Sequence, residues 1–180
     1  MKTLLTLLIM ICSASISTAA YPVAFVATLK DQAAATKAIA EINKQSGPLK
    51  NAGIENLHFF TQKVAGKDII LATMDFIYES DLYQPQTRWF DIQNTPKLKA
   101  AFTALNQAIL PHQRQKDASK SPWVRTETIC VIRPTNATVA KADSPWYAAV
   151  TGLKPEKEAE YRLLHNNVWP GVIQAIGASN

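Results

Sequence analysis

The order of apolar and polar segments between residues 21 and 132 is the feature that most constrains the fold of this chain. Four stretches rich in apolar and β-branched residues are typical of strands, and two amphipathic stretches between them have helical spacing. The strands are expected over 21–29, 56–63, 68–77 and 123–132, and the helices over 32–45, after the N-cap Asp31, and 96–109. The order strand, helix, strand, strand, helix, strand predicts a ferredoxin-like α+β unit with an antiparallel sheet and both helices on one face.

The same order begins again near the end of the sequence. Residues 146–153 alternate like a strand, and residues 154–169 follow with helical spacing, after a linker over 134–145 that is rich in Ala, Thr and Asp. We therefore expect one complete unit over 21–133 and a partial second repeat over 146–180. One strand and one helix cannot fold alone, so the 146–153 strand is expected to pair with another strand and to dock on the first unit or on a partner. A truncated gene product is one alternative.

The first twenty residues predict a secretory signal peptide. A short positive start precedes the apolar run Leu4–Ile11, and small residues over 13–20 would allow cleavage after Ala19 or Ala20. The apolar run is too short to span a bilayer, so we expect a secreted or periplasmic protein without a membrane anchor after cleavage. The mature chain would hold one cysteine, Cys130, and therefore no internal disulfide.

Charge and histidine spacing argue against two classes of protein. The formal charge of +5 is spread along the chain without a run of basic residues, so no nucleic-acid partner is expected. The three histidines, His58, His112 and His165, share no spacing typical of metal ligands, so no metal site is expected. His58 lies on a predicted strand, where it either faces solvent or lines a pocket on the sheet.

The most unusual motif is a helical stripe of three rings near the C-terminus. Tyr161, His165 and Trp169 are spaced i, i+4 and i+8, where an ordinary core helix carries aliphatic residues. A phenol, an imidazole and an indole suit a sugar pocket, because they exchange protons with hydroxyls and offer a flat apolar face. Pro170, inside the predicted helix, would leave the carbonyl of Asn166 without its helical partner. A surface helix with a half-buried tryptophan is the alternative.

A strand followed by Tyr-x-x-x-His-x-x-x-Trp-Pro resembles the L-rhamnose mutarotase family. Trp146–Leu153 stands in the place of the strand, and Gly171 stands where the family usually has an acidic residue. The N-terminal unit resembles the same fold, a dimeric α+β barrel type. There Ala34, Ala38 and Ile42 occupy the positions of the three rings, so that copy is expected to lack the catalytic pair.

The resemblance implies that the chain interconverts the α and β anomers of a 6-deoxyhexose without a cofactor. One general base and one general acid suffice for this ring opening, and His165 and Tyr161 would fill these roles. Trp169, Asn166 and Trp89 would contact the sugar, although Trp89 is also a good candidate for the core. The expected partner is a monosaccharide, and a homodimer is possible. A non-catalytic ferredoxin-like module for sugar binding or dimerisation is the alternative function.

Overall fold

The computed structural model describes residues 6–9, 21–64, 66–116, 121–127, 150–166 and 168–178. Two compact units share the chain: unit 1 comprises Met1–Thr18 and Glu127–Asn180, and unit 2 comprises Ala19–Thr126. The predicted linker, the strand end at 128–132 and most of the predicted signal peptide lie outside the described residues.

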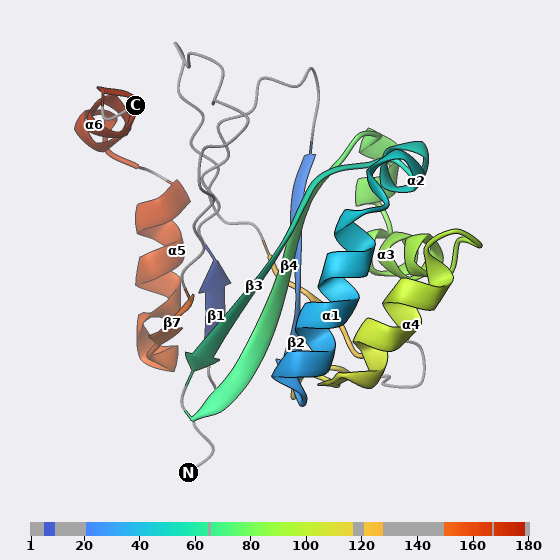
Figure 1. Cartoon of the computed structure of the whole chain (residues 1–180). Coiled ribbons are helices and arrows are strands. Elements are labelled where there is room, and N and C mark those ends of the chain that lie inside the picture. Colours follow the sequence, from blue (N-terminus) through green and yellow to red (C-terminus); the bar gives the residue numbers. More distant parts are fainter. Residues whose placement is uncertain are drawn as a thin grey trace. The chain divides into compact units, whose positions relative to one another are not determined.

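Unit 2 is built on an antiparallel sheet (Figure 1). The long strands β2 (Tyr21–Leu29), β3 (Ile54–Val64) and β4 (Lys67–Phe76) stand in the order β3-β4-β2. The short strands β5 (Ile109–Leu110) and β6 (Val124–Arg125) both pair with β2. The first strand therefore lies between the third and the last, which is the ferredoxin-like arrangement, and the predicted α+β fold class is confirmed.

Two helices of unit 2, α1 (Gln32–Asn43) and α4 (Lys99–Gln107), lie side by side on one face of this sheet (Figure 1). The carboxylate of Asp31 accepts a hydrogen bond from the N–H of Ala34 at 3.0 Å, which confirms the predicted N-cap. The second predicted helix starts at Lys99 instead of residue 96, because residues 95–98 form a turn in which Leu98 N–H donates to Thr95 O.

Three shorter helical segments connect these elements. They are α2 (Ser46–Asn51), the 3-10 helix η1 (Glu79–Leu82) and α3 (Pro85–Gln93). Helix α1 ends at Asn43, two residues before the predicted end at residue 45, and residues 46–48 begin α2. Pro48 is tolerated there because the first turn of a helix has no intrahelical partners for its N–H groups.

The core of unit 2 lies between the sheet and α1, α3 and α4. Every second residue of β2 enters it, and its two largest members are Trp89 of α3 and Trp123, neither of which has exposed surface. The Trp89 ring stacks on Phe25, with centroids 5.3 Å apart, and meets Phe102 and Trp123 edge to face at 5.2 and 6.0 Å. Such geometries add to the free energy of apolar burial.

Unit 1 contains a two-stranded antiparallel pair and two helices. Strand β7 (Val150–Leu153) pairs with β1 (Thr6–Ile9), which confirms that the C-terminal strand is paired over its described residues. The strand it pairs with lies within the predicted signal peptide, and not within the first unit at 21–133 as expected. The 3-10 helix η2 (Pro155–Lys157) leads into α5 (Glu158–Asn166), which is followed by α6 (Pro170–Ala178).

The prediction of one continuous helix through Trp169 and Pro170 is wrong. Helix α5 ends at Asn166, and Pro170 is the first residue of α6. A proline lacks the N–H that an interior helical position needs, whereas the first position of a helix leaves that N–H unused. The N–H of Val172 donates to Trp169 O at 2.9 Å and closes the first turn of α6. Among the described residues, no helix is both long enough and apolar enough to span a membrane.

Candidate functional site

Ion pairs fix the start of α5. Arg162 donates from Nε and Nη2 to Glu158 Oε1, at 3.0 and 2.8 Å, and its Nη1 lies 2.9 Å from Glu127 Oε1. The hydrogen bonds to Glu158 and Glu127 raise the pKa of the Arg162 guanidinium. Lys157 and Glu160 form a further pair at 2.7 Å. Acidic side chains in the first turn also favour the positive end of the helix dipole.

Tyr161 and His165 form the centre of the candidate site on α5. Their ring centroids lie 3.8 Å apart and the ring planes differ by 13°, so the two rings are stacked. The i, i+4 spacing places them on one face of the helix, and both side chains are half-buried. The structure therefore brings together the two residues that the sequence predicts as the catalytic pair.

A backbone contact fixes the protonation pattern of the imidazole. His165 Nδ1 lies 2.9 Å from the carbonyl oxygen of Tyr161. A carbonyl oxygen can only accept, so Nδ1 must carry the hydrogen in this hydrogen bond. The neutral imidazole then has its lone pair on Nε2, and no described residue hydrogen-bonds that nitrogen. Such an orienting bond is how proteins select the nitrogen that acts as a base.

The two other predicted sugar contacts of unit 1 lie at and beyond the end of α5. Asn166 is the last residue of the helix and is exposed. Trp169 lies in the connection to α6, and 73% of its surface is exposed. The break before Pro170 takes the indole off the α5 stripe, and helix periodicity does not fix its position against the stacked rings.

Trp89 is separated from this set. It belongs to the core of unit 2, where it is fully buried among Phe25, Phe102 and Trp123. Its ring offers no surface to a ligand in this conformation. Trp89 is therefore a core residue, which was the alternative role predicted for it from the sequence.

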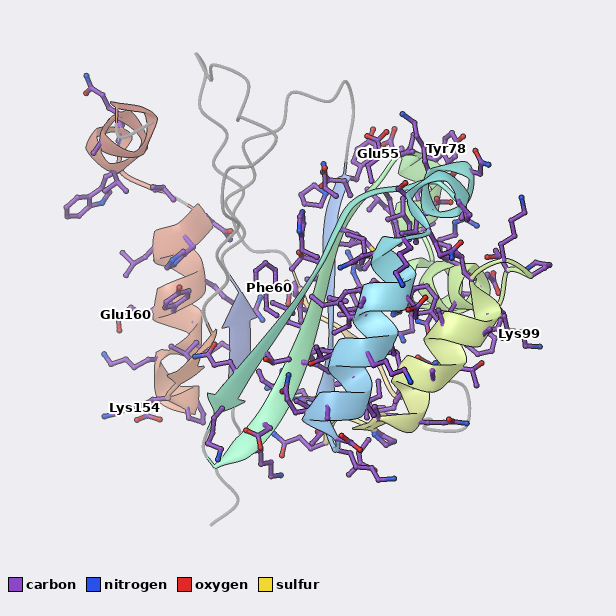
Figure 2. All side chains as sticks on the ribbon, viewed as in Figure 1. Glu55, Phe60, Tyr78, Lys99, Lys154 and Glu160 are labelled. Atoms are coloured by element: carbon purple, nitrogen blue, oxygen red, sulfur yellow. The ribbon has the colours of Figure 1, made fainter. Side chains whose placement is uncertain are left out.

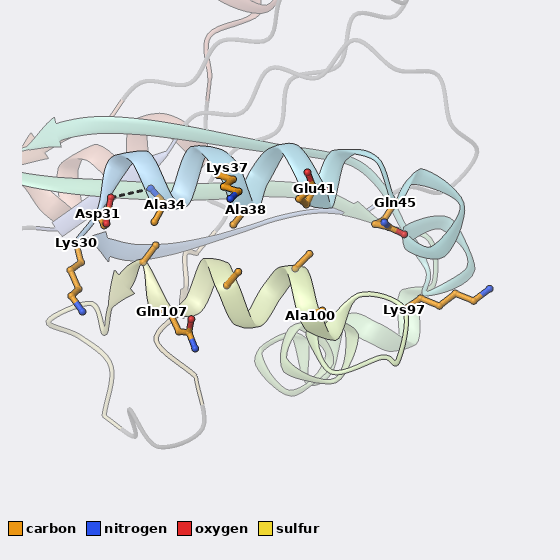
Figure 3. Close-up of a pocket in the computed structure, with 13 residues that line it drawn as sticks. Lys30, Asp31, Ala34, Lys37, Ala38, Glu41, Gln45, Lys97, Ala100 and Gln107 are labelled. Carbon is orange, nitrogen blue, oxygen red and sulfur yellow. Dashed lines mark hydrogen bonds between the residues drawn. The ribbon is translucent and has the colours of Figure 1, made fainter.

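A groove lies between α1 and α4 in unit 2 (Figure 3). It includes Ala34 and Ala38, two of the three positions that take the place of the ring residues in the predicted repeat. Its volume is about 580 Å³, and alanines from both helices form its floor, among them Ala34, Ala38 and Ala104. Lys30, Lys37, Glu41 and Lys97 stand along its rim. None of the lining residues is a histidine, cysteine or tyrosine. The groove has no group that ordinarily transfers protons near neutral pH.

A second polar cluster, in which His58 is the one member that the sequence suggested, lies at a bulge in β3. Glu55 pairs with Asp75 and His58 with Thr73, so two residues of β3 oppose one of β4. Asn56, in this bulge, has φ 53° and donates from Nδ2 to Asp75 Oδ2 at 2.8 Å. Asp75 is 4% exposed. A carboxylate inside the apolar run 69–77 was the signal that could have identified this cluster.

Burial lowers the pKa of His58, and the nearby Asp75 carboxylate partly offsets this effect. His58 and Phe60 are two residues apart on β3, so their side chains share one face of the strand, with ring centroids 6.4 Å apart. Figure 2 shows Phe60 on the side of the strand away from α1. In the part of the chain that the structure describes, no three His, Cys, Asp or Glu side chains gather into a group that could hold a metal ion.

Comparisons with known proteins bear on unit 1. The search of curated proteins gave no match. A scan against family models gave a match that covers 35 of the 180 residues and does not include residues 21–133. The resemblance of unit 2 to a known family therefore stays a prediction, and its topology shows the ferredoxin-like arrangement alone. The segment with β7, the stacked Tyr161 and His165 and the helix α6, residues 146–180, matches the family model of L-rhamnose mutarotase.

Proposed function

We propose that this protein is an L-rhamnose mutarotase-like enzyme that interconverts the α and β anomers of a 6-deoxyhexose. The observation that carries the proposal is the stacked pair Tyr161 and His165 within a segment that matches this family. The reaction needs a base and an acid and no redox change, so these two side chains supply the chemical groups that it requires.

The reaction would begin at the anomeric hydroxyl. His165 Nε2 takes the proton from O1, the C1–O1 bond becomes the carbonyl of the open-chain aldehyde, and the bond between C1 and the ring oxygen breaks. The Tyr161 hydroxyl gives a proton to the ring oxygen. Rotation about C1–C2 presents the other face of the aldehyde, and the reverse proton transfers close the ring. Both side chains return to their first protonation state, so atoms and charge balance.

Binding would use the residues around this pair. Asn166, at the end of α5, can donate and accept hydrogen bonds with sugar hydroxyls. The exposed ring of Trp169 would stack on the apolar face of the sugar, which in a 6-deoxyhexose includes a methyl group. Trp89 takes no part in this proposal because it is fully buried.

A helix cannot enclose a sugar, and α5 contains no buried residue. Leu163 and Leu164 are 64% and 52% exposed, so apolar surface on this helix is open to a partner. We propose that a second copy of the chain supplies further walls. We also propose, from the first twenty residues, that the mature protein acts outside the cytoplasm.

A specific observation favours a second candidate function. Among the described side chains, half-buried and exposed residues line the α5 face, whereas catalytic sites ordinarily exclude water. A non-catalytic module that binds a sugar or a second copy would use the same rings without proton transfer.

Saturation-transfer NMR on anomer mixtures distinguishes these functions. L-rhamnose, L-fucose and glucose are each measured with and without the wild-type protein. We expect faster α-to-β exchange for L-rhamnose than the spontaneous rate and a smaller effect for glucose, which has a hydroxyl in place of a hydrogen at C6. Exchange at the spontaneous rate for all three sugars would contradict the enzyme and favour the binding module.

A further inference from the structure

We infer that the core of unit 2 encloses a site for one internal water molecule, which accepts hydrogen bonds from Trp89 Nε1 and Gln93 Nε2. The inference uses no residue of the 146–180 segment and is therefore independent of the proposed mutarotase activity. It rests on two buried donors of α3 and on a chain of hydrogen bonds that fixes the orientation of one of them.

The two donors are deeply buried groups on one helix. Trp89 has no exposed surface, and Gln93 is 3% exposed. Among the residues that the structure describes, neither Trp89 Nε1 nor Gln93 Nε2 has a hydrogen-bond partner. Positions 89 and 93 are four residues apart in α3, so the two side chains lie on the same face of that helix. A buried donor without an acceptor costs free energy of folding, so two donors on one face favour a shared acceptor.

A chain of hydrogen bonds fixes the orientation of the Gln93 amide. Trp123 Nε1 donates to Asn106 Oδ1 at 2.9 Å, and an indole nitrogen can only donate. Asn106 must therefore turn its Nδ2 to Gln93, where it donates to Oε1 at 3.0 Å. Turning either amide by half a rotation would place two donors opposite each other. Gln93 Nε2 is therefore a donor at the end of this chain.

The four residues form a closed circle of contacts, so the two donors belong to one place in the core. Trp89 and Trp123 meet edge to face, with ring centroids 6.0 Å apart. The hydrogen bonds lead from Trp123 through Asn106 to Gln93, and one turn of α3 leads from Gln93 back to Trp89.

The backbone acceptor beside this circle is already used. The carbonyl oxygen of Trp123 accepts from Gln86 Nε2 at 2.7 Å and from Gln115 Nε2 at 2.8 Å. A carbonyl oxygen has two lone pairs, so these two amides occupy both. The donors of α3 therefore cannot share this carbonyl.

Water is the acceptor that fits the two donors. A water oxygen has two lone pairs, and internal waters ordinarily make about 2–4 hydrogen bonds to buried polar groups. Folded proteins hold about one buried water per 27 residues, so a unit of this size ordinarily contains several. A larger molecule is excluded because both residues are buried. An anion is disfavoured, since neither donor is charged and Phe25 and Phe102 surround the indole.

The test is NMR of the isotope-labelled full chain, in which magnetisation transfer from water to side-chain N–H groups is measured as NOE and as ROE. A water molecule held for longer than nanoseconds gives NOE and ROE peaks of opposite sign, whereas chemical exchange gives peaks of the same sign. We expect such water peaks at Trp89 Nε1–H and Gln93 Nε2–H. Trp123 Nε1–H, which donates to Asn106, is the control without a water peak.

A water peak at neither of the two α3 donors, or at only one of them, would overturn the inference. The Trp89 N–H would in that case have aromatic ring faces as its only neighbours, which are weak acceptors. These spectra need no variant, so the outcome does not depend on whether an altered core folds.

Two variants test whether the donors share one water. Trp89→Phe keeps a ring against Phe25 and removes the indole donor, so the water peak at Gln93 should be lost. Gln93→Met removes the amide donor, so the peak at Trp89 should be lost. Thr87→Ala, at an exposed position of α3, is the matched control and should keep both peaks. Unchanged peaks in both core variants would refute the shared site.

Discussion

The carbonyl oxygen of Tyr161 lies 2.9 Å from His165 Nδ1, while the rings of the same two residues stack at 3.8 Å. One helical turn therefore fixes both the orientation of the imidazole and the nitrogen that carries its hydrogen. In many enzymes a separate carboxylate does this work. Here the backbone of the neighbouring residue supplies the acceptor, so the candidate base needs no third side chain.

The aromatic core of unit 2 makes Trp89 a stability residue. Trp89→Ala should lower the free energy of unfolding by about 3–5 kcal/mol, because it removes one of the two largest side chains from a core that cannot refill the space. Trp169→Ala is the matched control, since that ring is 73% exposed, and its change should stay within about 0.5 kcal/mol. Denaturant unfolding measures both, and equal changes in the two variants would contradict the assignment of Trp89 to the core.

Gly53 should not tolerate a side chain. Its φ is +81°, and a Cβ there would lie 3.1 Å from Arg88 Nη2 and 3.2 Å from the Tyr78 ring. Arg88 is not free to move, because Nη2 donates to Ala52 O and Nε donates to Asp81. Gly53→Ala should therefore destabilise unit 2 by about 1–2 kcal/mol or more.

The control for this substitution is Gly47→Ala. Gly47 lies in α2, and a Cβ there would meet nothing within 4 Å. Thermal unfolding of this variant should match the wild type or exceed it slightly, because alanine restricts the unfolded chain. A Gly53→Ala protein as stable as Gly47→Ala would show that the turn before β3 adapts more easily than its contacts indicate.

Acid should destabilise unit 2 through its histidines. His112 is 7% exposed, and its Nδ1 accepts a hydrogen bond from the Arg114 N–H at 3.3 Å. Burial, and then the charges of Arg114 and Lys67, lower its pKa from 6.5, and burial lowers the pKa of His58. The unfolded chain therefore binds more protons than the folded one below pH 6.5. The contribution of these neutral histidines to the free energy of unfolding should be complete above that pH and should decrease as the pH drops through it.

Urea unfolding on both sides of pH 6.5 measures this effect. Each histidine contributes at most about 1.4 kcal/mol per pH unit. His112→Gln keeps a side-chain acceptor but has no group that titrates in this range, so the pH dependence of its stability should be shallower. The same slope in the variant and the wild type would exclude His112 as a source.

The pairing of β7 with β1 leads to a prediction about the predicted signal peptide. In the full chain the amides of β7 should be protected from hydrogen exchange. A chain that starts at Tyr21 lacks β1, so protection of β7 should require a second copy and increase with protein concentration. If β7 in the shortened chain is unprotected at every concentration, the proposed docking of a second copy fails.

Local sequence patterns were sufficient for the framework of unit 2. The apolar runs located β2, β3 and β4 to within about two residues, and Asp31 marked the start of α1. Helix α2 was missed because a Gly-Pro pair indicates a helix end, although proline is equally at home in a first turn. The break between α5 and α6 was missed for the related reason that Pro170 fits the first position of a new helix.

The candidate site could be predicted only in part. The stacked pair followed from the i, i+4 spacing, which a helix converts directly into contact. The burial of Trp89 and the link between Asn56 and Asp75 depend on segments far apart in the sequence, so no local pattern reveals them. The bulge in particular depends on the register between β3 and β4, which the alternation of apolar and polar residues along one strand does not specify.

The central claim is that His165 moves the proton that opens the sugar ring. If it is correct, His165→Ala should reduce the exchange between α- and β-L-rhamnose, measured by saturation-transfer NMR, to the spontaneous rate. Tyr161→Phe should slow it less, because it removes the second proton-transfer group but keeps the stacked ring. Ala38→His should not restore the activity of His165→Ala, since the groove of unit 2 lacks the neighbouring rings. A His165→Ala protein that accelerates the exchange as well as the wild type would contradict the account.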